Sequence, residues 1–230
     1  MNKTITPVDW GMIEYHEAWQ KQEELFQQTI QSKLNNAETN NYLVFCEHPH
    51  VFTLGKNGSA NNLLIGNLQL RSVHAQYVET NRGGDITYHG PGQIVGYPIF
   101  DLANFDLGLK QYIFKMEEAV INTLRQIGIQ TERMEGATGV WLDTAIPAKC
   151  RKICAIGVRS SHFVTMHGFA LNVNTDLNYF SYINPCGFVD KGVTSVQNEL
   201  GAPYSISKIK QLLQAEFNHL FCDEQNTILK

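Results

Sequence analysis

The sequence RGGDITYHGPGQ, residues 82–93, gathers side chains suited to holding a small molecule. Its glycines allow the backbone to approach a ligand closely, and a proline restricts the turn at its end. Turns alone would explain the glycines but not the polar and amphipathic side chains among them, which are Arg82, Asp85, Thr87, Tyr88, His89 and Gln93. This glycine stretch therefore predicts a ligand site. The phosphate-binding pattern GxxxxGK[ST] is absent from the sequence and GxGxxG from the stretch, so nucleotide binding has no support.

Cysteine thiolates are strong nucleophiles, but an ordinary thiol, with a pKa of about 8.5, is only a few per cent ionised at neutral pH. Cys46 lies in an apolar run and Cys222 at the end of a predicted helix, as small core or surface residues do. Cys186 lies between a proline and a glycine, in a turn that can present its sulfur to a cleft. Cys150 is the rival because three basic residues adjoin it. The residues alone leave both open.

Three further side chains have a functional and a structural interpretation. Lys152 begins the run KICAIGVR, whose alternation places Lys152 and Cys154 on one face of a strand. It is either a solvated strand end or an ammonium that stabilises a thiolate or moves protons. His89 and His167, each followed by glycine, are either bases or hydrogen-bonded core histidines.

The cysteine pattern argues against a metal site. The five cysteines are an odd number with no CxxC spacing, and the sequence shows no secretion segment, so reduced thiols are expected. Cys150 and Cys154 lack a second cysteine or histidine pair at zinc-site spacing.

Apolar spacing predicts three amphipathic helices, at residues 15–34, 110–127 (closed by Gly128) and 205–221. Residues 41–48 and 51–55 read as a hairpin-like pair of strands, and residues 55–62 as a polar loop. Further strands are predicted at residues 75–80, 86–90, 93–102, 138–143, 151–160 and 162–174.

Two details refine this prediction. Pro98 suggests an edge or an irregular exit of its strand, and Ser160-Ser161 suggests a hairpin turn. Because the elements lack a regular βαβ rhythm, we expect an α+β fold, with a mixed, mostly antiparallel sheet flanked by helices, in one domain over residues 1–230.

Charge and hydropathy exclude other classes. The chain has 230 residues, a net charge of −4 and a pI near 6.0, so the basic surface of a nucleic-acid-binding protein is not expected. No segment has the apolar length of a membrane span or a leader, so we expect a cytoplasmic protein without membrane contact.

The ordered blocks RGGDITYHGPGQIVGYPIFDL, KICAIGVR, HGFALNVN, INPCGF and GVTSV resemble the octanoyltransferases, or lipoyl(octanoyl) transferases. They span residues 82–196, about half the chain, and EHPHVFTLGKNG upstream is similar to the family's early block. The resemblance implies the catalytic fold of biotin and lipoate protein ligases. It also implies a dyad of Cys186 and Lys152, which settles the rivalry against Cys150.

The resemblance further implies which residues line the acyl substrate. These are Arg82, Gly83, Gly84, Asp85, Ile86, Thr87, Tyr88, His89, Ala155, Ile156, Gly157, Gly168, Phe169 and Ala170. The implied reaction moves an octanoyl group from octanoyl-acyl carrier protein to a lysine of apo lipoyl domains, through a thioester on the cysteine, as the first step of endogenous lipoate synthesis. The implied acceptors are the lipoyl domains of 2-oxoacid dehydrogenase E2 subunits and the glycine cleavage H protein. No cofactor or metal is implied, and we expect a monomer.

Other classes fit less well. An ATP-dependent lipoate or biotin ligase needs no cysteine nucleophile, whereas HGPGQ and the Pro-Cys-Gly turn resemble the transferase. A papain-like hydrolase would use His89 or His167 as its base. A carrier-domain binding module with a vestigial pocket would not need the intact lysine and cysteine.

Two residues depart from the family pattern: Cys154 stands where a small residue such as alanine is more usual, and Lys56 where arginine is common. Because acyl carrier proteins are typically acidic, as is this chain, a local basic rim is also expected near the motifs. Its candidates are Lys149, Arg151, Arg159 and Lys191.

Overall fold

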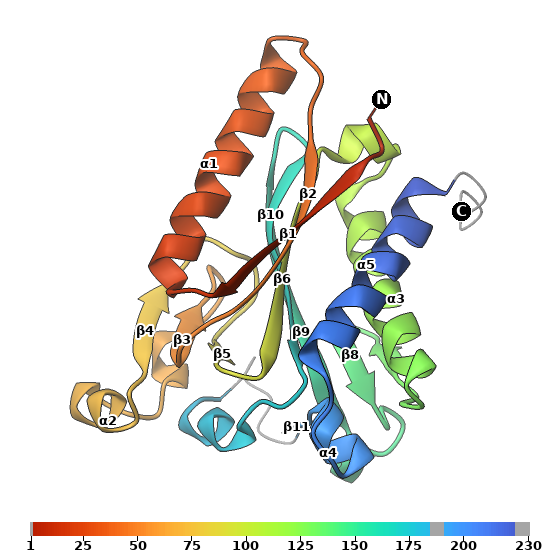
Figure 1. Ribbon diagram of the computed structural model, residues 1–230. Helices are drawn as coiled ribbons and strands as arrows, with labels where there is room; N and C mark the ends of the chain where they lie inside the picture. The colour runs from red at the N-terminus through yellow and green to blue at the C-terminus, as the bar shows by residue number, and fades with distance from the viewer. Residues whose placement is uncertain (1, 185–190, 224–230) are drawn as a thin grey trace.

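The computed structural model describes residues 2–184 and 191–223 (Figure 1). Over these residues an eight-stranded sheet has the order β1-β2-β6-β10-β9-β8-β7, with β11 paired to β9. Its strands are β1 Ile5–Met12, β2 Asn41–Glu47, β6 Gln93–Ile99, β7 Glu132–Met134, β8 Ala137–Leu142, β9 Arg151–Ser161, β10 Val164–Asn172 and β11 Gly192–Val193. All these pairings are antiparallel except β1 with β2 and β11 with β9. The predicted mixed, mostly antiparallel sheet is confirmed.

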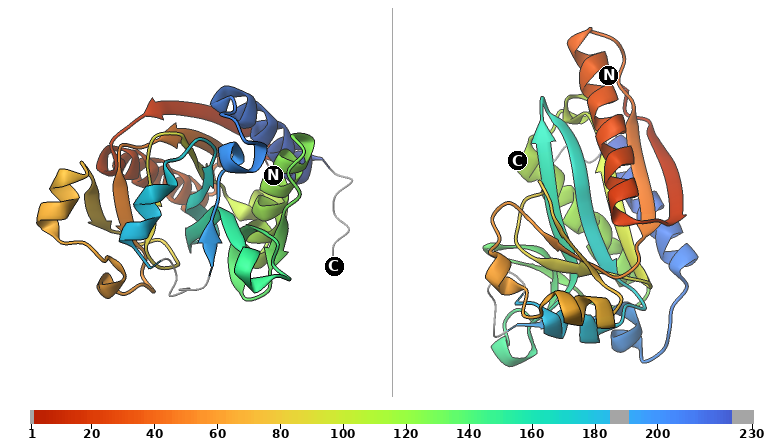
Figure 2. Two further views of the ribbon diagram at one scale, coloured as in Figure 1. Left: turned by 90° about the horizontal axis from the view of Figure 1, so that it is seen from below. Right: turned by 90° about the vertical axis from the view of Figure 1, so that its left-hand side faces the viewer.

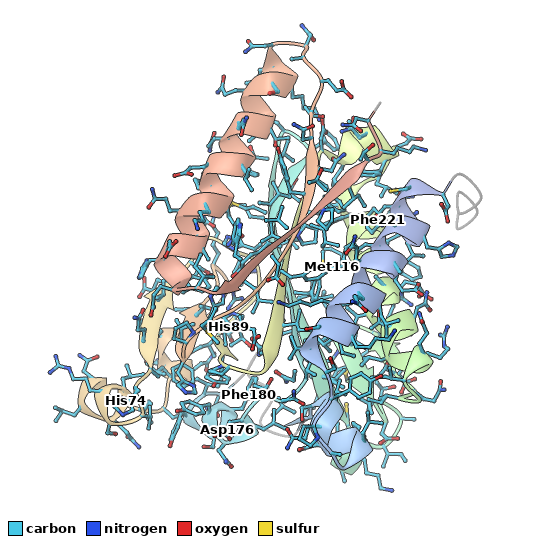
Figure 3. The ribbon with its side chains drawn as sticks, in the orientation of Figure 1. His74, His89, Met116, Asp176, Phe180 and Phe221 are labelled. Atoms are coloured by element: carbon cyan, nitrogen blue, oxygen red, sulfur yellow. The ribbon has the colours of Figure 1, made fainter. Side chains whose placement is uncertain are left out.

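Three long helices cover the two faces of this sheet (Figure 1). Helix α1, Tyr15–Leu34, lies on one face, and α3, Leu109–Gln126, and α5, Ile206–Cys222, pack together on the other. Met116 of α3 and Phe221 of α5 point into the core between these two helices and the sheet (Figure 3). Burial of these apolar stripes is the main source of stability of such helices.

The helix boundaries follow the local chemistry that predicted them. Helix α3 is followed by Gly128 at φ +88°, a left-handed conformation that glycine adopts without strain. Helix α5 begins after Ser205, whose side chain accepts a hydrogen bond from the backbone N–H of Lys208. All three predicted helices are confirmed to within a residue or two.

A second, three-stranded sheet has the order β4-β3-β5 and lies on the α1 side of the molecule (Figure 2). Its strands are β3 Val51–Leu54, β4 Gln76–Glu79 and β5 Thr87–His89, and the short helix α2, Asn67–Ser72, precedes β4. The predicted hairpin of residues 41–48 and 51–55 is wrong, because β2 pairs with β1 and β6 whereas β3 pairs with β4 and β5. The chain passes between the sheets at His48-Pro49-His50, so two adjacent strand signals belong to different layers.

Strand β6 is central, not an edge strand, because β2 and β10 flank it. Its pairing with β10 ends at Gly96, two residues before Pro98, whereas its pairing with β2 continues to Ile99. The missing N–H of Pro98 is therefore tolerated beyond the last position that pairs with β10. The predicted irregularity near Pro98 is confirmed on the side of β10, and the predicted edge position of this strand is wrong.

The hairpin of β9 and β10 exists, but its turn lies two residues later than predicted. Ser160 and Ser161 pair with Thr165 and Val164, and the turn is made by His162 and Phe163, with φ of 54° and 63°. Positive φ at both central residues matches the twist of the strands. Strand β1 was not predicted, because it is an edge strand with mostly exposed side chains and therefore a weak apolar alternation.

The remaining described elements are short. They are the helix α4, Val196–Leu200, and the 3-10 helices Ala60–Asn62, Leu102–Phe105, Pro147–Lys149 and Leu177–Tyr182. The last of these leads toward the segment that contains Cys186, and β11 follows that segment. Both therefore bear on the site.

Candidate active site

A cavity of about 460 Å³ lies where the glycine stretch meets β6, β9 and β10. Beyond Cys154, β9 has no partner in β8, and its open edge faces the glycine stretch, where the N–H of Gly83 donates to Val158 O at 2.9 Å. His89, in β5, lies between the small sheet and the large one, with Phe180 below it (Figure 3). The volume is in the usual range for a small-molecule pocket.

Most of the residues predicted to line the substrate do line this cavity. They are Arg82, Gly83, Gly84, Asp85, Ile86, Thr87, His89, Ala155, Ile156, Gly157, Gly168, Phe169 and Ala170, together with Lys152. Tyr88 is elsewhere: it is fully buried on the other face of β5, where its ring stacks on Tyr179 at 4.8 Å and its hydroxyl lies 2.7 Å from His50 Nδ1. Its role in the structure is to pack the 3-10 helix Leu177–Tyr182 against the small sheet.

The glycines allow three backbone segments to close on one another beside the cavity. A Cβ added at Gly157 would lie 2.7 Å from Gly83 O, and one added at Gly55 would lie 2.3 Å from Gly84 O. Both distances are shorter than any real Cβ contact, and Gly84 itself has a φ of +84°. The wall of the cavity thus depends on side chains being absent at these positions.

Arg82 holds this wall together from inside. Its Nη2 atom donates to Thr53 O at 2.6 Å, to Thr53 Oγ1 at 2.9 Å and to Asp85 O at 2.8 Å, and Nη1 donates to Gly83 O at 3.0 Å. The guanidinium is buried among carbonyl oxygens that a lysine could not reach together. Arg82 is therefore bound to the loop, and its charge adds a positive potential to the cavity wall.

A chain of buried hydrogen bonds runs from His89 to the backbone of Lys152. His89 Nδ1 lies 2.8 Å from Gln93 Oε1, Gln93 Nε2 donates to Asn172 Oδ1 at 2.9 Å, and Asn172 Nδ2 donates to Thr194 O at 3.0 Å. The N–H of Thr194 in turn donates to Lys152 O at 2.9 Å. Because Gln93 Oε1 can only accept, the chain assigns the proton of neutral His89 to Nδ1. This chain connects the glycine stretch to the strand that carries Lys152.

Three histidines around this region are buried and neutral. Burial lowers the pKa of His48 to about 4, and burial, with nearby positive groups, lowers those of His89 and His167 to about 3. His48 lies 2.7 Å from both Ile13 O and Tyr97 Oη, and His167 Nε2 lies 2.6 Å from Asn81 Oδ1. These contacts support the interpretation of His89 and His167 as hydrogen-bonded core histidines.

Lys152 is positioned by the centre of the large sheet. Its backbone pairs with Trp141 of β8 on one side and with Val193 of β11 on the other. The side chain lines the cavity, and its Nζ lies 4.5 Å from the centroid of the Trp141 ring. The amine therefore lies beside the cavity, half-buried, and not at a fully solvated strand end.

Cys186 lies outside the described residues, but the segments on both sides of it are described. On the N-terminal side, Asn184 N donates to Asn62 O at 2.8 Å, and Asn62 Nδ2 donates to Asp85 Oδ2 of the glycine stretch at 2.6 Å. On the C-terminal side, Lys191, Gly192 and Val193 line the cavity. Both flanks of Cys186 are therefore attached to the site.

The four described cysteines do not line the cavity. Burial raises the pKa of the Cys46 and Cys154 thiols, and the Cys222 thiol donates to Lys3 O at 3.0 Å. Cys150 is buried at the end of a 3-10 helix, where its N–H bonds to Ile146 O. Cys154 packs into the core under α3 and α5.

Several cavity residues were not singled out from the sequence. Trp141 and Tyr15 line the cavity, and Asn172 and Thr53 belong to the hydrogen bonds that support it. Asn172 could have been singled out from the sequence, since an amide at the end of an apolar strand is buried and needs hydrogen-bond partners. Trp141 could not, because only the register of β8 and β9 brings it to Lys152.

The predicted basic rim is partly occupied by ion pairs. Arg151 pairs with Asp143 and with Glu199, the latter at 2.7 Å, and Arg159 pairs with Glu23 at 3.0 Å. Lys191 lines the cavity and Lys149 is exposed nearby on β9's N-terminal side.

Metal centres and membrane spans are two further features to consider. Within residues 2–184 and 191–223, no cluster of three or more histidine, cysteine or acidic residues has the arrangement of a metal site. None of the helices in the same part of the chain has the length and apolar character needed to cross a membrane.

Comparison with known proteins identifies the family. Residues 14–218 match the model of the lipoyl protein ligase A/B catalytic domain. An octanoyltransferase of Bacteroides thetaiotaomicron is 53% identical over 226 residues, covering 98% of this chain and 99% of that protein. An octanoyltransferase of Bacteroides fragilis is 56% identical over 214 residues, covering 93% of this chain and 96% of that protein.

Among solved structures, a bi-partite lipoate protein ligase from Thermoplasma acidophilum superposes with a TM-score of 0.68, covering 93% of this chain and 82% of that chain. Its sequence identity is 17%, so this likeness concerns the fold, which is the predicted ligase catalytic fold. Taken with the site described above, the family model and the curated relatives show that this chain is an enzyme of the octanoyltransferase family.

Proposed function

We propose that this enzyme moves an octanoyl group from octanoyl-acyl carrier protein to a lysine of apo lipoyl domains through a thioester on Cys186. The observation that carries the proposal is the cavity that Lys152 shares with the glycine stretch. The proposed acceptors are the lipoyl domains of 2-oxoacid dehydrogenase E2 subunits and the glycine cleavage H protein. We further propose that the enzyme acts in the cytoplasm, as a monomer, in the first step of endogenous lipoate synthesis.

The position of Cys186 in the chain supports its role. It lies two residues after Asn184 and six before Gly192, whose backbone pairs with Arg151 next to Lys152. Six residues span at most about 20 Å, so the chain length between these anchors is compatible with a sulfur that reaches the cavity. Cys150, the rival nucleophile, is buried outside the cavity.

In the first step the Cys186 thiolate attacks the thioester carbonyl of the donor. A new carbon–sulfur bond forms on the enzyme, and the bond to the carrier's thiol breaks. The departing thiolate takes a proton from the Lys152 ammonium, which until then has favoured the ionised form of Cys186. The products are a free carrier thiol, an octanoyl-enzyme and a neutral Lys152.

In the second step a neutral acceptor lysine attacks the enzyme thioester. An amide bond forms, the bond to Cys186 breaks, and the proton of the attacking amine passes to Lys152. This restores the thiolate and the ammonium. Because thioester exchange is roughly energy-neutral and conversion of a thioester to an amide is downhill, the cycle needs no ATP.

The proposed path of the acyl chain follows the glycine-lined wall. Gly83, Gly84 and Gly157 bring backbone, not side chains, to the cavity surface, and Ile156 and Phe169 supply apolar contacts. Backbone N–H groups of the glycine stretch would be available to the oxyanion that develops at the carbonyl carbon.

The test is mass spectrometry of the enzyme after incubation with octanoyl-acyl carrier protein. We expect one added octanoyl group on Cys186, lost when an apo lipoyl domain is added, and no modification of Cys186→Ser. Cys150→Ser is the matched control and should acylate normally. Full transfer by the Cys186→Ser enzyme would refute the covalent step, and transfer that required ATP would indicate a ligase.

We also propose that Lys149, which is exposed just before β9, and Lys191, which lines the cavity, attract the acidic carrier protein. Lys149→Glu should raise KM for octanoyl-acyl carrier protein about 3- to 10-fold at low salt with little change in kcat. Lys208→Glu, on the exposed side of α5, is the control. A KM that is unchanged in the Lys149 variant would contradict this docking surface.

A further inference from the structure

Asn172 is a buried amide in the wall of the cavity, and it uses only one of its two N–H groups within the part of the chain that the structure describes. The residue is 4% exposed and lies in β10, opposite Gln93 of β6. Its Nδ2 atom carries two hydrogens and donates to Thr194 O at 3.0 Å. The second hydrogen can therefore be offered to a group bound in the cavity.

Gln93, the other buried amide in the wall, already uses both of its N–H groups. Its Nε2 atom donates to Tyr88 O at 3.1 Å and to Asn172 Oδ1 at 2.9 Å. Because backbone carbonyls only accept hydrogen bonds, Tyr88 O and Thr194 O determine which end of each amide carries the nitrogen. The neighbours of Asn172 thus fix the orientation of its amide.

The hydrogen bonds that lead to Asn172 all donate in one direction, away from a positive charge. Arg82 Nη2 donates to Thr53 Oγ1 at 2.9 Å, and Thr53 Oγ1 lies 3.2 Å from His89 Nε2. Because Nδ1 of the neutral His89 ring carries the proton, Nε2 accepts from the Thr53 hydroxyl. His89 then donates to Gln93, and Gln93 donates to Asn172. Such a chain polarises each successive group, so the N–H of Asn172 is a stronger donor than that of an isolated amide.

The amide lies at the end of the cavity where Lys152 is positioned. Thr194, the acceptor of the Asn172 hydrogen bond, donates its own N–H to Lys152 O at 2.9 Å. The side chains of Asn172 and Lys152 both line the cavity. In the proposed function the Lys152 amine gives its proton to the departing thiolate, so the thioester carbonyl lies in this part of the cavity during the reaction.

We infer that Asn172 is a catalytic residue, which donates its second N–H to the carbonyl oxygen of the acyl thioester. The inference rests on the proposed function, in which attack on this carbonyl creates a tetrahedral intermediate with a negative oxygen. A donor that is already in place stabilises this charge without reorganisation during the reaction. An amide does not exchange its protons with substrate, so it can bind the oxyanion and leave proton transfer to Lys152.

The first experiment compares two reactions of Cys186: acylation by octanoyl-acyl carrier protein in a single turnover, and alkylation by iodoacetamide. Asn172→Ala should slow acylation about 10²- to 10³-fold at saturating donor, the usual cost of removing one oxyanion donor. Alkylation creates no oxyanion, so its rate should stay within about twofold of the parent. Asn104→Ala is the control, since it removes a buried amide that bonds to Thr39 away from the cavity, and it should leave both rates unchanged.

The second experiment observes the hydrogen bond itself, through the infrared band of an isotope-labelled carbonyl in the octanoyl-enzyme. The band should lie at a higher wavenumber in Asn172→Ala than in the parent, because loss of a hydrogen bond strengthens the carbonyl bond. Thr53→Val interrupts the chain before His89 and should move the band in the same direction by less. No movement in the Thr53 variant would overturn the polarising role of the chain. Asn172→Leu, which keeps the side-chain volume, provides the same tests if the alanine variant does not fold.

The outcomes separate this inference from the proposed function. Acylation of folded Asn172→Ala at the parental rate, or an unmoved carbonyl band, would overturn the inference and leave the proposed function intact. An equal fall in acylation and alkylation would show that the substitution disturbs the nucleophile, and it would also overturn the inference. A parent enzyme that formed no octanoyl-enzyme would contradict the proposed function and, with it, this inference.

Discussion

Two groups of basic side chains border the same cavity, and their surroundings differ. On the side of α1, His89 and His167 line the cavity and His48 lies next to His89, and all three histidines are buried, hydrogen-bonded and neutral. On the side of β8, Lys152 lies over an aromatic ring at the cavity wall, and its backbone pairs with β11, the strand that follows the segment containing Cys186. Histidine is the side chain most often used as a general base, yet here burial and hydrogen bonding have made it structural. The environment of a group, more than its type, indicates whether it can take part in proton transfer.

The largest expected effect comes from removing the amine. Lys152→Met keeps most of the side-chain volume and should slow octanoyl transfer at least about 10³-fold, in the range of lost general acid–base catalysis, while leaving the thermal midpoint within a few degrees. His167→Asn is the comparison, since asparagine tolerates the left-handed backbone at φ 59°. Its transfer rate should fall about 10-fold at most, and its pH profile should keep its shape. Loss of one limb of that profile would show that the histidine is the base and would reverse the comparison.

The second effect is the dependence of stability on pH. The folded-state pKa values of His48, His89 and His167, about 4, 3 and 3, lie below the unfolded value of 6.5. The unfolded chain therefore binds more protons between these values, and stability rises with pH in that window. The stability that the neutral histidines contribute is fully present above about pH 6.5. It is lost as the pH falls toward 4, and the free energy of unfolding then drops by about 1.4 kcal/mol per pH unit for each histidine. Urea unfolding at pH 7.5, 6.5 and 5.5 measures this, and a flat profile would mean that the histidines are accessible to protons.

The same contrast explains what could be predicted from the sequence. The helices and most strands were predictable because their apolar spacing is local, and local chemistry sets helix ends, with Ser205 before the first residue of α5 and Gly128 after the end of α3. The assignment of β3 to a second sheet was not, because it depends on which distant strands satisfy its backbone. Likewise, RGGDITYHGPGQ pointed to a ligand site from residue types alone, whereas the contact of Lys152 with Trp141 exists only through the register of β8 and β9.

The third prediction concerns Arg82, which holds the glycine-lined wall of the cavity together. Arg82→Lys keeps the charge but loses most of the hydrogen bonds from the guanidinium to Thr53, Gly83 and Asp85. We expect the free energy of unfolding to fall by about 2–3 kcal/mol and KM for the acyl donor to rise, because the glycine stretch is no longer held on β3. Thr53→Val removes one of the same partners and should cost less. Equal stability of the lysine variant and the parent in urea would show that Arg82 serves the ligand alone.

The smallest expected effect comes from removing Cys154, which is close to Lys152 in the chain but is not the proposed nucleophile, Cys186. Cys154 is two residues from Lys152, but it is fully buried under α3 and α5, and burial raises the pKa of its thiol. A buried thiol of this kind is a poor nucleophile, and access to it requires local unfolding. Cys154→Ala should therefore cost about 1 kcal/mol of stability by leaving a small cavity, and transfer should stay within about twofold of the parent. In the native parent, iodoacetamide should label Cys186 far faster than Cys154, and comparable rates would show that the strand beside Lys152 opens to solvent on the time scale of the reaction.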